Sequence, residues 1–214
     1  MDPIRPRPRG RPKDAGKRTA VLDAARRLFL QHGADGVALD VVIAEAGVSK
    51  ATFYANFNER AALLEAVISR EAERVIQDEE APEDGGMSLQ QRLTAFGVRL
   101  LRLLFGRETL GFERLLASAT GAHPNLPARL FEAGPGRSRR VLAGLIAAGV
   151  RSGELELDDP VSAAEDLCGL WQGMLRIEMA MGLVPLPGEA VLQARSARGV
   201  ELFFRLYGTG RPAA

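Results

Sequence analysis

Apolar residues recur every three or four positions along almost the whole chain, and this spacing is the feature that most restricts its fold. In the segment 17–33 such a stripe is formed by Val21, Leu22, Ala25, Leu28 and Phe29. This spacing places apolar side chains on one face of an α-helix, whereas a half-buried strand requires strict alternation, which is missing here. The sequence therefore predicts an all-α protein.

One interruption of the helical pattern divides the chain. Pro82 and two following glycines stand among acidic residues, where they would stop a helix and bury little apolar surface. We expect a flexible basic arm at 1–16, a helical domain at 17–80 and a second helical domain at 87–214. With 214 residues, 46% of them hydrophobic, the chain is long enough for one sizeable core or two small ones, and length alone does not decide between them.

Glycine and proline bound the expected helices. Asp159 followed by Pro160 is a start signal, because the carboxylate suits an N-cap and proline suits the first helical position. The expected helices cover 17–33, about 40–46, the segment after Ser49, about 59–78, 88–105, 108–121, 126–133, 136–152, 160–182 and 188–207.

Charge and cysteine content indicate the compartment. The chain has 28 Lys and Arg residues against 27 Asp and Glu residues, so attraction to nucleic acid must come from their distribution, and basic residues gather between Arg5 and Arg18. The N-terminus lacks the apolar run of a secretory signal, no segment suits a membrane span, and Cys168 is the only cysteine. We expect a cytoplasmic protein without membrane contact.

The segment IAEAGVSKATFYANFNER, at 43–60, predicts two short helices joined by a tight turn. Gly47 suits the turn and Ser49 suits the N-cap of the second helix, while Phe53 and Phe57 supply apolar anchors. The outward residues of the second helix carry donors and no carboxylate, which suits phosphates and base edges. The alternative is an ordinary solvated helix face.

Residues 21–67 resemble the N-terminal domain of the TetR family of transcriptional regulators, whose pattern AGVSKxTxYxxF is present at 46–57. The resemblance implies a double-stranded DNA operator as partner. It implies that Thr52 and Tyr54 contact phosphates and that Lys50 and Ala51 lie closest to base edges. The complete set of implied DNA-binding residues in this domain is Ser49, Lys50, Ala51, Thr52, Tyr54, Asn56 and Arg60.

Three positions differ from the family pattern. Asn56 stands where the family often has histidine. Arg60 stands where family members usually have lysine, and either cation can reach a phosphate. Ala38 stands where a Ser or Thr commonly caps the helix before the turn. We expect Asp40 to substitute as the cap.

The basic stretch PRGRP, at 8–12, resembles the core of an AT-hook. The resemblance implies that Arg9 and Arg11 enter a narrow A·T-rich minor groove, where only glycine lets the backbone lie deep enough. The alternative is a disordered tail that merely increases solubility.

The stretch 112–176 is similar to the C-terminal domains of an AefR-like branch of the TetR family, in the order proline-rich turn, long helix, GEL, DDP and GMLR. The similarity implies an apolar cavity for a small-molecule effector and a four-helix dimer interface made by the last two long helices. The cavity candidates are Phe96, Leu100, Leu104, Phe112, Leu116, His123, Trp171, Gln172, Met174 and Arg176. The interface candidates in the homodimer are Gly169, Gly173, Val200, Phe203, Phe204 and Tyr207. Ordinary core packing is the alternative for the apolar members.

No catalytic or metal-binding arrangement emerges from the sequence. His32 and His123 are the only histidines; His32 lies near the expected helix end at Gly33, and His123 with Pro124 marks an expected turn. We therefore expect no enzyme activity, no metal and no cofactor. The sequence predicts a dimeric, sequence-specific transcriptional repressor that a small molecule releases from a palindromic operator. The alternatives are an activator or effector-independent regulator of the same fold, a helical enzyme, and an architectural minor-groove protein.

Overall fold

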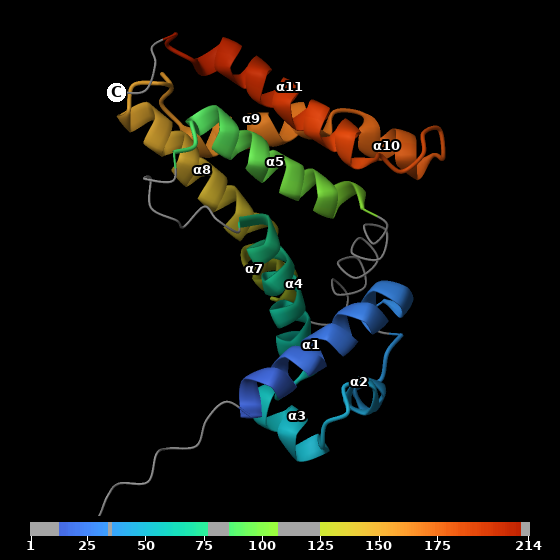
Figure 1. Cartoon of the computed structure of the whole chain (residues 1–214). Helices are drawn as coiled ribbons and strands as arrows, with labels where there is room; N and C mark the ends of the chain where they lie inside the picture. Colours follow the sequence, from blue (N-terminus) through green and yellow to red (C-terminus); the bar gives the residue numbers. More distant parts are fainter. Residues whose placement is uncertain (1–12, 34–35, 77–85, 107–124, 211–214) are drawn as a thin grey trace, which may run out of the picture.

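The computed structural model describes residues 13–33, 36–76, 86–106 and 125–210. Within these ranges the regular elements are α-helices, which confirms the predicted fold class (Figure 1). Helix α1 begins at Lys13, earlier than the expected start at residue 17. The helices are α1 (Lys13–His32), α2 (Leu39–Glu45), α3 (Lys50–Asn56), α4 (Arg60–Ile76), α5 (Leu89–Phe105), α7 (Leu126–Ala133), α8 (Pro135–Arg151), α9 (Pro160–Gln172), α10 (Leu175–Ala180) and α11 (Glu189–Tyr207).

Helices α1 to α4 share one hydrophobic core, into which α7 also packs. Phe29, Phe53 and Leu63 are fully buried there, one from each of α1, α3 and α4. The apolar spacing that predicted these helices thus supplies the side chains that hold them together. Figure 1 shows α1, α2 and α3 at one end of the molecule and α4 extending from them toward α7 and α8.

A second core lies between α5, α8, α9 and α11, and Trp171 is its largest fully buried side chain. A Cβ atom on Gly97 or Gly199 would come within 2.6 Å of the Trp171 ring, so both positions require glycine for α5 and α11 to approach the indole. The indole Nε1 donates to the carbonyl of Ser196 at 3.1 Å. Trp171 is therefore a core residue, and its assignment to the cavity wall is wrong.

The expected helix at 160–182 is two helices. Asp159 caps α9 as predicted, because its carboxylate accepts from the backbone N–H of Val161 at 2.9 Å. The helix ends at Gly173, whose φ of +48° and ψ of −138° strongly favour glycine. Helix α10 begins after this break, at Leu175.

Helix α11 packs its most apolar face into its own protomer. Val200 and Phe203 are 2% and 0% exposed, and Phe203 contacts the rings of Phe204 and Tyr207. Buried side chains cannot form the contact surface of a dimer, so their assignment to the interface is wrong. Tyr207 is half-buried and its hydroxyl donates to Asp166 at 2.6 Å, which raises the pKa of the phenol.

Ion pairs fasten α4 on two sides. Toward α1, Glu71 pairs with Arg26 at 2.7 Å and Arg70 pairs with Asp23 at 2.7 Å. Toward α7 and α8, Arg129 pairs with Glu65 and Arg137 with Glu73. Helix α4 is therefore the element through which the two halves of the described chain are joined.

Candidate nucleic-acid interface and effector cavity

The turn between α2 and α3 has the geometry that the sequence predicts. Gly47 adopts a φ of +63°, in the left-handed region that glycine tolerates best. The hydroxyl of Ser49 accepts from the backbone N–H of Thr52 at 3.1 Å and so caps α3. Phe53 is fully buried beneath the turn and fixes the orientation of α3 against α1.

The outer face of α3 presents donors to solvent. Lys50, Ala51 and Tyr54 are exposed, and Thr52 and Asn56 are half-buried. The Tyr54 ring meets the edge of Phe53 at a centroid distance of 5.3 Å, which holds the phenol while its hydroxyl remains accessible. The Asn56 amide donates to the carbonyl of Thr52 at 2.9 Å. Such a face can bind phosphates and base edges, as a helix placed in a major groove does.

Lys50 is held by an acidic neighbour on α2. Its Nζ lies 2.9 Å from Oδ1 of Asp40, and the hydrogen bond to this carboxylate raises the pKa of the amine. Asp40 does not cap α2, because the N-cap residue is Ala38 and no side chain bonds to the first turn. The expectation that Asp40 replaces the missing cap is wrong, and the carboxylate orients Lys50 instead.

Arg60 has a structural contact of its own. Its Nη1 donates to the carbonyl of Val37 at 2.6 Å, which ties the start of α4 to the segment before α2. The guanidinium has further donors, so this contact leaves the predicted phosphate contact open. Arg9 and Arg11 lie outside the described residues.

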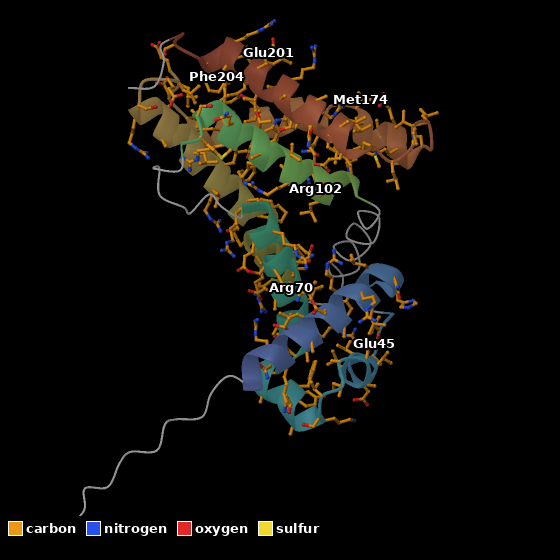
Figure 2. The ribbon with its side chains drawn as sticks, viewed as in Figure 1. Glu45, Arg70, Arg102, Met174, Glu201 and Phe204 are labelled. Atoms are coloured by element: carbon orange, nitrogen blue, oxygen red, sulfur yellow. The ribbon has the colours of Figure 1, made fainter. Side chains whose placement is uncertain are left out.

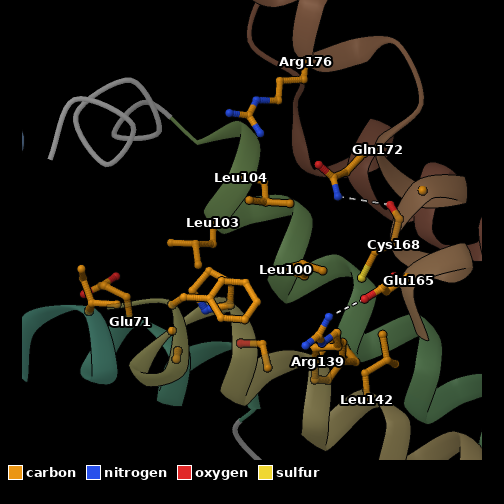
Figure 3. Close-up of a pocket in the computed structure, with 18 residues that line it drawn as sticks. Glu71, Leu100, Leu103, Leu104, Arg139, Leu142, Glu165, Cys168, Gln172 and Arg176 are labelled. Atoms are coloured by element: carbon orange, nitrogen blue, oxygen red, sulfur yellow. Dashed lines mark hydrogen bonds and ion pairs between the residues drawn. The ribbon is translucent and has the colours of Figure 1, made fainter. Parts of the chain in front are cut away.

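A cavity of about 590 Å³ lies between α4, α5, α8 and α9, with α7 and α10 at its edges (Figure 3). Five of its predicted residues line it: Phe96, Leu100, Leu104, Gln172 and Arg176. The assignment of Met174 is wrong, because the break after α9 leaves this side chain 66% exposed and away from the cavity. Phe112, Leu116 and His123 lie outside the described residues. Gly169, predicted for the dimer interface, lines the cavity.

Sequence reasoning missed most polar residues of the cavity wall. They come from three helices far apart in the sequence, and only their packing brings them together: Glu71, Ser138, Arg139, Glu165 and Cys168. Arg139 of α8 forms an ion pair with Glu165 of α9 in the cavity wall. Burial raises the pKa of the Cys168 thiol to about 11, so the group is neutral at physiological pH and a poor nucleophile.

The described residues contain no group of three or more His, Cys, Asp and Glu side chains placed to hold a metal ion. Among the helices in the same part of the chain, none is long and apolar enough to cross a membrane.

Two family models match the chain. The model for bacterial regulatory proteins of the tetR family matches residues 21–67, and the model for the C-terminal domain of AefR-like transcriptional repressors matches residues 91–209. Among curated proteins, the HTH-type transcriptional regulator YdeS of Bacillus subtilis is 32% identical over 161 residues, which cover 74% of this chain and 77% of YdeS.

Solved structures give the same result. The flavonoid-responsive regulator FrrA superposes with a TM-score of 0.70 and 30% identity, over 92% of this chain and 100% of FrrA. A TetR transcriptional regulator from Agrobacterium tumefaciens superposes with a TM-score of 0.69 and 31% identity, over 91% of this chain and 95% of its own. The helix-turn-helix at 39–56, its exposed donors and these relatives lead to one conclusion: the chain is a DNA-binding transcriptional regulator and belongs to the TetR family.

Proposed function

We propose that this regulator is a homodimeric repressor that leaves a palindromic operator when a small molecule fills the cavity. The similarity of residues 91–209 to AefR-like repressors supports repression. FrrA, at 30% identity, responds to flavonoids, which supports a small organic effector here. A cavity of about 590 Å³ lies within the usual size range of small-molecule sites.

The position of Glu71 is the observation that carries the proposal. The residue is 3% exposed and lines the cavity, and its carboxylate binds Arg26 of α1 and Arg74 of α4. A molecule that enters the cavity meets the same side chain that holds α4 against the helix-turn-helix domain. Filling the cavity can therefore bias the orientation of α1 to α3, because the two sites share one buried contact.

Matched variants on α4 test this link. Glu71→Gln keeps the size of the side chain and removes the charge that holds Arg26, so we expect operator affinity to change several-fold in the absence of effector. Glu73→Gln is the control, since Glu73 pairs with Arg137 of α8 and does not line the cavity. Equal effects of the two variants in fluorescence-anisotropy titrations would contradict a special role of Glu71.

In the proposed homodimer, the second protomer is expected to cover an exposed apolar segment of the first. Large apolar side chains between 48% and 67% exposed follow one another along α10 and the segment before α11: Met174, Ile177, Met181, Leu183 and Leu186. Figure 2 shows Met174 beside α10, in the part of the molecule remote from the helix-turn-helix. A series of exposed apolar side chains of this kind is typical of a contact surface, and we propose it in place of the interface expected from the sequence.

Two experiments test the complete proposal. Sequencing DNA fragments selected by the purified protein is expected to return a two-fold symmetric motif, because a symmetric dimer reads two half-sites. Expression of a reporter gene under the control of that motif is expected to rise when the regulator is removed. A fall would identify an activator, and a motif without symmetry would contradict the homodimer.

A further inference from the structure

The charged side chains that line the cavity already have partners or meet solvent. In the described part of the chain, Glu71 binds Arg26, and Arg139 binds Glu165. Arg176 is exposed at one end of the cavity. Glu71 and Glu165 both line the cavity, so an anionic group placed deep in it would meet two carboxylates of like charge.

Gln172 is different, because the described residues supply no donor to the oxygen of its side-chain amide. Its Nε2 donates to the backbone carbonyl of Cys168 at 3.3 Å. A carbonyl only accepts, so this bond fixes which end of the amide is nitrogen. Figure 3 shows the oxygen on the other side, toward Leu104. No described residue donates to this oxygen, which is an acceptor and never a donor.

We propose that the effector is a largely apolar molecule without formal charge that carries a hydroxyl or N–H group, and that Gln172 selects it by accepting that hydrogen. The inference rests on the proposed function of the cavity as the effector site. A ligand that seals the cavity removes water from the Gln172 oxygen, and the loss is compensated only when the ligand itself donates. An ether leaves the oxygen unpaired, and a carboxylate places negative charge against it.

Ser138 supplies a second polar contact but does not discriminate. It is 8% exposed and lines the cavity on α8, where no described group binds its hydroxyl. A hydroxyl can both donate and accept, so it serves either kind of ligand group. Leu100, Leu103 and Leu104 supply apolar contact on the α5 side. Selection between a donor and an acceptor therefore depends on Gln172.

The single tryptophan provides a direct measure of binding. Trp171 stacks on Phe96 at a centroid distance of 6.3 Å, and Phe96 lines the cavity. Three probes of nearly equal shape are titrated against the full-length protein: 4-phenylphenol, 4-methoxybiphenyl and biphenyl-4-carboxylate. We expect the phenol to bind about tenfold more tightly than the ether or the carboxylate, the cost of leaving one buried acceptor unpaired.

Two variants locate the preference. Gln172→Met keeps an unbranched side chain of similar length but removes the acceptor, so the phenol and the ether should bind with nearly equal affinity. Ser138→Ala is the matched control and should retain the preference for the phenol. If Ser138→Ala abolishes the preference and Gln172→Met does not, the selecting residue is Ser138 and the proposal is overturned.

Operator release, measured with the same probes, separates the two hypotheses. Selective binding of the phenol without release of operator DNA would support the assigned ligand chemistry and refute the proposed function. Equal binding of all three probes, or tighter binding of the carboxylate, would refute the ligand chemistry alone. If none of the probes binds, the ligand chemistry is refuted.

Discussion

At the residue scale, Asp40 of α2 constrains one side chain on the exposed face of α3. An isolated carboxylate near DNA would be repelled by phosphates, yet Asp40 lies within 2.9 Å of the Lys50 amine, which neutralises it. The same contact limits the directions that the long lysine side chain can take. A flexible cation binds any phosphate, whereas an oriented one can discriminate between base edges.

Substitutions at this pair are expected to change base preference. Lys50→Ala should reduce discrimination at one operator position by about tenfold, the effect of losing one good base contact. Asp40→Asn should bind non-operator DNA more tightly and discriminate less, because it frees the amine and removes a negative charge. Sequencing of selected DNA measures both. Glu45→Gln is the control. Glu45 lies on the same helix as Asp40 but pairs with Arg27, so its substitution should leave base preference unchanged.

Arg60 and Tyr54 are expected to act on affinity without changing base preference. Arg60→Ala should weaken binding to all operator variants. It should also reduce the magnitude of the slope of log affinity against log salt concentration by about one. It should also destabilise the domain by about 1 kcal/mol, since the Val37 carbonyl loses its donor. Tyr54→Phe removes only a neutral hydroxyl, so it should weaken binding without altering the salt dependence. Titrations at several salt concentrations and urea denaturation measure these effects, and an unchanged slope in Arg60→Ala would rule out the phosphate contact.

At the element scale, local signals located most helix starts, and one tertiary feature escaped them. Ser49 and Asp159 are caps that the sequence identifies, because a side-chain oxygen and the N–H groups that it binds lie a few residues apart. Gly173 carries no comparable signal, since an isolated glycine is compatible with a continuous helix. The neighbouring contact comes from a distant part of the chain, since the Arg195 guanidinium of α11 donates to the backbone carbonyl of Gln172 at 3.1 Å.

Alanine substitutions distinguish the two kinds of glycine. Gly173→Ala should lower the free energy of unfolding by about 1–2 kcal/mol, because an L side chain is strained at positive φ. Gly144→Ala, within α8 where an added Cβ meets no atom within 4 Å, should raise it by about 0.5–1 kcal/mol. Denaturant titrations with circular dichroism measure both. If Gly173→Ala instead stabilises the protein, Gly173 does not have a positive φ in solution.

The site was predictable where it depends on one helix and unpredictable where it depends on several. Helical spacing placed Phe96, Leu100 and Leu104 on one face of α5, and that face lines the cavity. The same spacing cannot tell a core residue from a cavity residue, so Trp171 was assigned wrongly. From the sequence, Glu71 is expected on a solvated helix face. In the structure, α1 packs against it and Arg26 binds its carboxylate.

At the scale of the whole molecule, the exposed apolar segment around α10 is expected to hold two protomers together. Leu183→Glu should yield a folded monomer, because Leu183 is 67% exposed in the protomer and a charge in an apolar interface costs several kcal/mol. Phe203→Glu should instead unfold the protein, since Phe203 is fully buried. Sedimentation velocity with circular dichroism distinguishes these outcomes. Met87→Glu, at a residue 50% exposed just before α5, is the control and should remain a dimer.

The basic N-terminal stretch is expected to extend the contact with DNA beyond the helix-turn-helix. Arg9→Ala together with Arg11→Ala should lower operator affinity while leaving the free energy of unfolding unchanged, because α1 begins only at Lys13. The loss should be larger for operators with A·T-rich flanks, whose narrow minor groove attracts arginine, than for G·C-rich flanks, whose exocyclic amino group obstructs it. Lysine at both positions should restore affinity poorly, since the ammonium is more strongly hydrated than guanidinium. Titrations on the two operator types measure the difference; equal losses would indicate general electrostatic attraction, and no loss would show that the stretch does not bind DNA.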